Sequence, residues 1–106
     1  MTNKNYLPQT NEALQAAIFK MGDTVVDYIN SNGKKRYAVV TADLICKESL
    51  YVTCKTIEYD NKHPNMEIVN SSGVLVFAWD ADKFMRINAQ AVTGLTPLST
   101  VLCSRN

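Results

Sequence analysis

Hydrophobic and polar residues alternate on both sides of Asn32-Gly33, and this alternation predicts an antiparallel hairpin. The alternating runs are Val25 to Ile29 and Tyr37 to Val40. An Asn-Gly pair between two such runs favours a tight turn, because both residue types tolerate positive φ. The sequence therefore predicts a strand over residues 24–30, a turn at 31–33 and a second strand over 34–41.

A helical pattern precedes the hairpin. Its apolar residues recur three and four positions apart, and they are Ala13, Leu14, Ala17, Ile18 and Met21. Thr10 or Asn11 can cap the start of this helix, and Gly22 can end it. A helix of about three turns has little stability in water by itself. We therefore expect its apolar stripe to pack against the sheet that follows.

Downstream of the hairpin, turn-forming residues separate four further expected strands. Residues 50–59 are interpreted as a strand with apolar side chains on both faces, because these side chains occupy alternate positions. The segment 61–65, which contains His63 and Pro64, is expected to be an exposed loop. The other strands are expected at Met66 to Val69, Val74 to Trp79 and Phe84 to Ile87.

The stretch from Val74 to Trp79 is the most hydrophobic of these strands, so we place it at the centre of the sheet. Turns are expected before it at Asn70 to Gly73 and after it at Asp80 to Asp82. The apolar tail from Ala91 to Val101 is divided by Gly94 and Pro97, and its structure is left open.

These elements predict an α+β fold, mainly β, in which the N-terminal helix packs on a small antiparallel, half-open β-barrel of five or six short strands. Gly22-Asp23-Thr24-Val25 resembles the Gly-Asp-x-Val turn that often begins the first strand of SH3-like small barrels. This resemblance covers roughly two thirds of the chain and implies a fold but no activity. With 106 residues, we expect a loose arm over 1–9 and a single domain over 10–106.

Composition narrows the classes of function. The chain has 11 Lys and Arg against 10 Asp and Glu, so its net charge of +1 gives no overall field that would attract nucleic acid or an anionic membrane. The polar N-terminus does not resemble a secretory signal, and no window approaches membrane-spanning length. Three widely spaced cysteines suit a reducing compartment. We therefore expect a cytoplasmic protein without a membrane partner.

The groups that could bind a metal ion have poor spacing for it. Cys46, Cys54, His63 and Cys103 are ligand types that zinc prefers, but structural zinc sites draw their ligands in close pairs. Asp80 and Asp82 could hold a hard cation, although such a pair more often forms a turn. We predict no metal site and no other cofactor.

Catalysis by a cysteine and histidine pair is the third-ranked hypothesis. Cys54 or Cys46 would need His63 within hydrogen-bond reach and a further group to orient it, and the sequence indicates no such arrangement. Phosphate-binding loops, HExxH helices and GxSxG elbows are absent from the sequence. We predict no catalytic residue and expect that the protein is not an enzyme.

Two kinds of binding surface remain. The first is an exposed aromatic strand surface for another protein or a second copy of the chain, as in a small accessory or inhibitor protein; its candidate residues are Tyr51, Ile57, Tyr59, Trp79 and Phe84. The alternative is a nucleic-acid surface of cations and stacking rings, formed by Lys34, Lys35, Arg36, Tyr37 and Lys55 with the strand tyrosines. We favour the protein interface, because lysines and tyrosines are also common on solvated strand faces.

Overall fold

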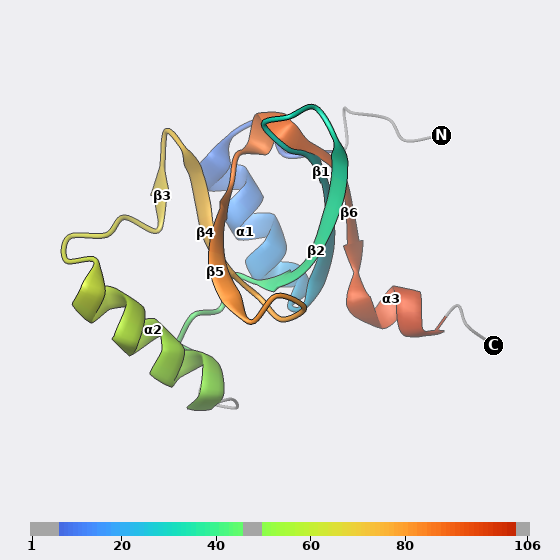
Figure 1. The fold of residues 1–106 in the computed structure, drawn as a ribbon. Helices are drawn as coiled ribbons and strands as arrows, with labels where there is room; N and C mark the ends of the chain where they lie inside the picture. The colour runs from blue at the N-terminus through green and yellow to red at the C-terminus, as the bar shows by residue number, and fades with distance from the viewer. Residues whose placement is uncertain (1–6, 46–49, 104–106) are drawn as a thin grey trace.

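The computed structural model describes residues 7–45 and 50–103, and it shows a strongly curved six-stranded antiparallel sheet with helices on both of its sides (Figure 1). In chain order the elements are α1 (Asn11–Met21), β1 (Thr24–Ile29), β2 (Lys35–Thr41), α2 (Leu50–Lys62), β3 (Val69–Asn70), β4 (Gly73–Ala78), β5 (Lys83–Ile87), the 3-10 helix η2 (Ala89–Ala91), β6 (Val92–Pro97) and α3 (Leu98–Cys103). The predicted α+β, mainly β class is therefore confirmed.

The strands form a half-open barrel in the order β3-β4-β2-β1-β6, and β5 pairs with β4. One edge of β4 pairs with β5, while its other edge is shared by β3, opposite Val74, and by β2, opposite Ala78. The prediction that this strand lies at the centre of the sheet is confirmed. The sheet does not close between β5 and β6, which the short helix η2 connects.

The β1–β2 hairpin is confirmed, and its turn is closed largely by Asn30. The Asn30 backbone N–H donates to the Lys34 carbonyl at 2.9 Å, and its side-chain Oδ1 accepts from the backbone N–H groups of Asn32 and Lys34, each at 2.9 Å. Of the Asn-Gly pair, only Gly33 has a positive φ, of 79°. Within the Asn-Gly pair, the turn therefore uses the conformational tolerance of the glycine alone.

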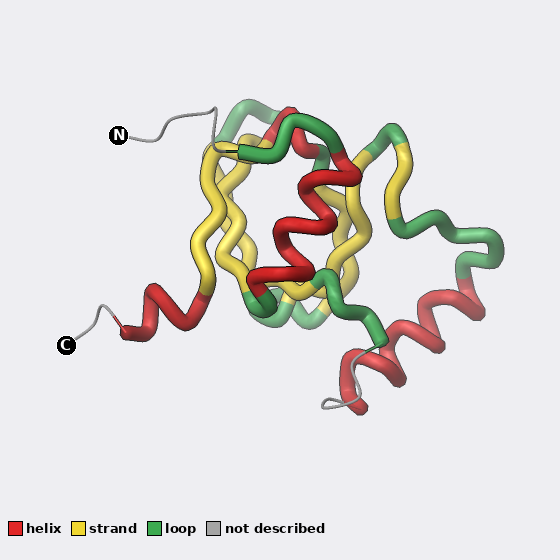
Figure 2. Tube along the Cα trace, turned by 180° about the vertical axis from the view of Figure 1, so that it is seen from behind, coloured by secondary structure: helices red, strands yellow, loops and turns green. Residues whose placement is uncertain are grey.

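Helix α1 begins and ends where the sequence predicts. Thr10 is the N-cap, and its Oγ1 accepts from the Ala13 N–H at 3.1 Å. Gly22 has a φ of 80° and donates its N–H to the Ile18 carbonyl at 3.0 Å. Leu14 and Ile18 are fully buried, and the helix lies across the concave side of the sheet (Figure 2). The expected packing of this helix on the sheet is confirmed.

The alternating side chains of β4 contribute to two separate cores. Val74, Val76 and Ala78 belong to the inner core, together with Leu14 and Ile18 of α1 and the inward side chains of β1 and β2. Leu75 and Phe77 point to the other side and form the outer core with Leu44 and Val52. Because both faces of β4 are covered, all six of its residues are buried. A strand that is buried on both faces is expected to be continuously apolar.

The predicted strand over residues 50–59 is wrong, because this segment is the helix α2. Its β-branched residues and its alternation are compatible with a strand, but Val52, Thr56 and Tyr59 are also spaced for one face of a helix. That face covers Leu75 and Phe77 of β4. The Thr56 hydroxyl lies 2.8 Å from two carbonyl oxygens, those of Val52 in the preceding helical turn and of Leu44. Tertiary packing thus overrides the β-propensity of the segment.

Three smaller differences separate the predicted elements from the observed ones. The exposed loop starts at His63 rather than at 61, because α2 extends to Lys62. The strand expected at 66–69 is reduced to Val69–Asn70, which pairs only with the start of β4. The apolar tail contributes β6, which pairs with β1 and provides the sixth strand that residues 50–59 do not form.

In the described part of the chain, no helix is long and apolar enough to span a membrane.

Candidate functional site

Five aromatic residues from α2 and the β4–β5 hairpin form a connected cluster with Phe77 at its centre. We call Tyr51, Tyr59, Phe77, Trp79 and Phe84 the aromatic cluster. The ring centroid of Phe77 lies 6.1 Å from that of Tyr51, 5.4 Å from that of Trp79 and 5.2 Å from that of Phe84, with steep interplanar angles. Tyr59 packs on Phe84 at 4.7 Å. Edge-to-face contacts of this kind stabilise ring pairs beyond the burial of their area.

Two carboxylates accept hydrogen bonds from polar atoms of the aromatic cluster. The Tyr51 hydroxyl donates to Asp82 Oδ1 at 2.5 Å, and Trp79 Nε1 donates to Asp23 Oδ1 at 2.9 Å. The hydrogen bond to Asp82, with desolvation and the negative charge of that carboxylate, raises the pKa of Tyr51 above its ordinary value, while Lys55 opposes the shift. These contacts attach α2 to the β4–β5 turn and fix the side chain of Trp79.

The turn expected at Asp80 to Asp82 is confirmed. Asp80 Oδ1 accepts from the Val39 N–H at 3.1 Å, and Asp82 has a positive φ of 52°. Asp82 also receives the Tyr51 hydroxyl. Both carboxylates therefore have hydrogen-bond partners within the protein, which is the turn role that the sequence favoured over a cation site.

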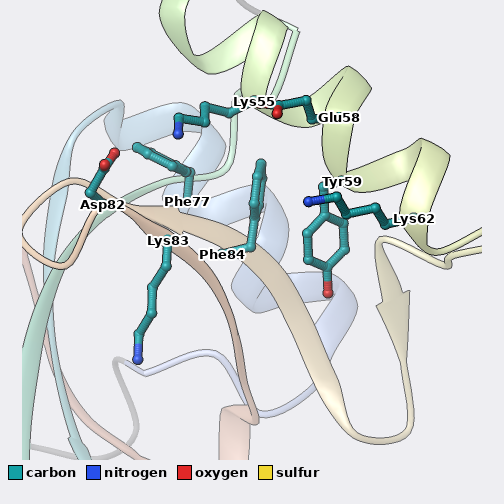
Figure 3. Close-up of a pocket in the computed structure, with 8 residues that line it drawn as sticks. All are labelled: Lys55, Glu58, Tyr59, Lys62, Phe77, Asp82, Lys83 and Phe84. Carbon is teal, nitrogen blue, oxygen red and sulfur yellow. The ribbon is translucent and has the colours of Figure 1, made fainter.

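A groove with a volume of about 290 Å³ lies between α2 and β5, above the aromatic cluster (Figure 3). It is lined by Lys55, Glu58, Tyr59, Lys62, Phe77, Asp82, Lys83 and Phe84. The side chain of Lys55 extends from α2 above Phe77 and that of Lys62 ends beside Tyr59, whereas Lys83 points away from the rings (Figure 3). The groove thus has an aromatic floor with ammonium groups at its rim.

A different side of α2 carries apolar residues that face solvent. Leu50, Cys54 and Ile57 are spaced four and three residues apart, so they share one face of the helix, which we call the outer face of α2. Leu50 is 73% exposed and Ile57 is 58% exposed. Cys54 is exposed and has a free thiol. The helix therefore has apolar residues both on its buried side and on its outer face.

The structure brings four of the five predicted protein-interface residues together. Tyr51, Tyr59, Trp79 and Phe84 all belong to the aromatic cluster, whereas Ile57 lies on the outer face of α2. The description of these residues as a strand surface is wrong, because the first two and Ile57 are on a helix.

The predicted nucleic-acid residues are divided between two ends of the molecule. Lys34, Lys35, Arg36 and Tyr37 are all exposed at the β1–β2 hairpin. Lys55 is on α2, at the opposite end of the structure, where its Nζ lies 5.5 Å from the ring centroid of Tyr51 (Figure 1). The basic triplet and Tyr37 thus form one patch, and Lys55 is not part of it.

The candidate metal ligands are not assembled in the part of the chain that the structure describes. Cys46 lies outside the described residues, and Cys103 ends α3. The ring of His63 stacks on Tyr59 at 4.1 Å, with Nδ1 3.0 Å from the Tyr59 carbonyl oxygen. At 1.5 Å per residue, Cys54 and His63 are separated by roughly 13 Å along the helix axis. Among the described residues there is no group of three or more metal-ligating side chains.

Sequence reasoning missed most of the groove, because it assigned residues 50–59 to a strand. Lys55, Glu58, Tyr59 and Lys62 are three, four and seven residues apart, which is the spacing of one helical face. Recognising that period would have placed these side chains together. The contribution of Lys83 could not be found in this way, since it comes from a distant strand.

Comparison with protein family models, with curated proteins and with solved structures finds no match to this chain. The resemblance to SH3-like barrels therefore stays a prediction.

Proposed function

We propose that this protein is a non-enzymatic interaction module that binds another protein through the outer face of α2. In this proposal it is a small cytoplasmic accessory protein, which acts by occupying the surface of its partner. The aromatic cluster supports the interface from below, because it fixes the position of the helix on the sheet.

The observation that carries the proposal is the exposure of Leu50 and Ile57 on one face of α2. The buried residues of the helix are Val52 and Thr56, whereas Leu50 and Ile57 are exposed. Ile45, shortly before the helix, is 75% exposed. Grouped exposed apolar residues support an interaction surface, since burying them against a partner releases ordered water, whereas scattered ones require no explanation. A helix that presents i and i+7 anchors is also a recurrent recognition element.

The test compares two variants of the immobilised protein in extract of the source cells. The double variant Leu50→Lys/Ile57→Lys places charges on the outer face of α2, and the matched control Phe19→Lys places one on α1, where Phe19 is 54% exposed. We expect the wild type and the control to retain the same partner, and the double variant to lose at least about 30-fold in affinity, the effect of a hot-spot residue. Equal retention by all three proteins would contradict the proposal.

Self-association is distinguished by measuring the mass of the purified protein in solution. A dimer that the double variant Leu50→Lys/Ile57→Lys converts to a monomer would identify a second copy as the partner. A monomeric wild type that retains a different protein would support a heterologous partner. In both cases the control Phe19→Lys should behave as the wild type does.

Nucleic-acid binding is the second candidate, and the exposed patch of Lys34, Lys35, Arg36 and Tyr37 supports it. We expect a fluorescent single-stranded oligonucleotide to bind at low salt, with an affinity that falls as salt rises, because each phosphate contact releases counterions. The triple variant Lys34→Gln/Lys35→Gln/Arg36→Gln should reduce the slope of log affinity against log salt by about 2. An oligonucleotide that fails to bind the wild type at low salt would exclude this candidate.

A further inference from the structure

The groove between α2 and β5 combines an apolar floor with positive charge at its rim. The floor consists of rings: Phe77 is buried, while Tyr59 and Phe84 are half-buried and turn part of their surface toward the groove (Figure 3). Ring surfaces of this kind favour contact with a flat, apolar group. The alkyl stems of Lys55 and Lys62 extend the apolar surface upward before ending in ammonium groups.

The charges of the lining favour an anion. The lining contains three lysines and two carboxylates, those of Glu58 and Asp82, a net charge of +1. Because Lys83 points away from the rings, the ammonium groups available above them are those of Lys55 and Lys62 (Figure 3). Asp82 already accepts the hydrogen bond of Tyr51, and Lys55 Nζ lies 5.5 Å from the ring centroid of Tyr51, a contact that leaves its ammonium group able to bind an anion. An anionic group at the rim would therefore gain charge-assisted hydrogen bonds that the protein does not itself supply.

The size of the groove limits what it can accept. Its volume of about 290 Å³ is at the small end of the range for ligand sites in proteins, so it suits one or two fused rings rather than a long chain. We propose that this groove binds a small aromatic anion, that is, a flat ring system that packs on Tyr59 and Phe84 and bears a carboxylate, sulfonate or phosphate near Lys55 and Lys62. This site is on a different flank of α2 from Leu50 and Ile57, so it is independent of the proposed protein interface.

The experiment uses two probes that share a ring system and differ in charge. Naphthalene sulfonate and the neutral naphthalene methanol are titrated into isotope-labelled protein, and the backbone amide resonances are followed by NMR. We expect saturable shifts confined to the residues around the groove, and an affinity for the sulfonate at least about fivefold higher than for the alcohol, the effect of one well-placed charge pair. Added salt should reduce this advantage, since the lysines are near the surface.

A pair of lysine variants then tests the positive rim. In Lys55→Gln/Lys62→Gln the sulfonate should lose its advantage and bind no more tightly than the alcohol, while the alcohol should bind as it does to the wild type. The control Lys20→Gln/Lys34→Gln removes the same charge from exposed sites on α1 and the hairpin, and it should bind both probes as the wild type does.

Any one of three results would overturn the proposal. The first is equal affinity of both probes for the wild type, and the second is an advantage of the sulfonate that persists in Lys55→Gln/Lys62→Gln. The third is a set of shifts centred on Leu50, Cys54 and Ile57. The last result would place the probe on the outer face of α2 rather than in the groove. Because these lysines are exposed or half-buried, we expect both double variants to retain the amide spectrum of the folded protein.

Discussion

The two longer helices, α1 and α2, use similar lengths of chain in different ways. Helix α1 has 11 residues, is capped by Thr10 and Gly22, and inserts the fully buried Leu14 and Ile18 into the concave side of the sheet. Helix α2 has 13 residues and covers the outer side of β4 mainly through Val52, Thr56 and Tyr59. Its outer face exposes Leu50 and Ile57, whereas the large exposed ring on α1 is that of Phe19.

The two helices also differ in what their buried stripes contact. The buried stripe of α1 is aliphatic and continuous with the inner core, so its contacts are with the protein's own sheet. The buried stripe of α2 contains a threonine that needs hydrogen bonds, and ring contacts that lie near the surface. Substitutions in the two helices should therefore have unequal effects on stability.

The largest expected effect comes from a matched pair of isoleucine truncations. Ile18→Ala should lower the free energy of unfolding by about 2–5 kcal/mol, because it leaves a cavity in the inner core. Ile57→Ala should change it by less than about 0.5 kcal/mol, because that side chain is exposed. Urea unfolding followed by circular dichroism measures both. A comparable loss in the two variants would show that the outer face of α2 is covered.

An intermediate effect is expected for the buried hydroxyl of α2. Thr56→Val keeps the shape of the side chain but removes the hydrogen bond that reaches the carbonyl of Leu44 or Val52. It should cost about 1–3 kcal/mol of stability, since a buried carbonyl loses its donor. The same unfolding experiment applies, with Thr56→Ser as a control that keeps the hydroxyl. If Thr56→Val were as stable as the wild type, the contact with Leu44 would not help to hold α2.

The smallest effect concerns the contact between Tyr51 and Asp82. Because this hydrogen bond raises the pKa of Tyr51, the protonated phenol is favoured in the folded protein. Its contribution to stability should be fully present below the unfolded pKa of about 10 and should be lost as pH rises through the higher folded pKa. NMR of ring-labelled tyrosine measures the titration. In Asp82→Asn the Tyr51 resonance should titrate at a lower pH, and an unchanged titration would contradict the assignment.

Local patterns were sufficient for α1, the β1–β2 hairpin and the central strand. Thr10 and Gly22 mark the ends of the helix, Gly33 marks the turn, and the run from Val74 to Ala78 indicates a strand buried on both sides. In each case the physical cause lies within a few neighbouring residues, so the sequence alone predicts the element.

Helix α2 could not be predicted in this way, because its sequence fits two periods. Val52, Thr56 and Ile57 are β-branched and favour a strand, and what decides for a helix is the apolar outer side of β4, which comes later in the chain. The candidate site could be predicted only in part for the same reason. Four of the five rings of the aromatic cluster are predicted from the sequence as interface candidates, but the groove depends on where α2 lies against β5.

The position of β4 between two cores has a consequence for how this molecule melts. Its alternate side chains belong to the inner core under α1 and to the outer core under α2, so neither layer can separate from the sheet without exposing the same strand. Heating should therefore release both helices in a single cooperative transition, with coincident midpoints by far-ultraviolet circular dichroism and by tryptophan fluorescence.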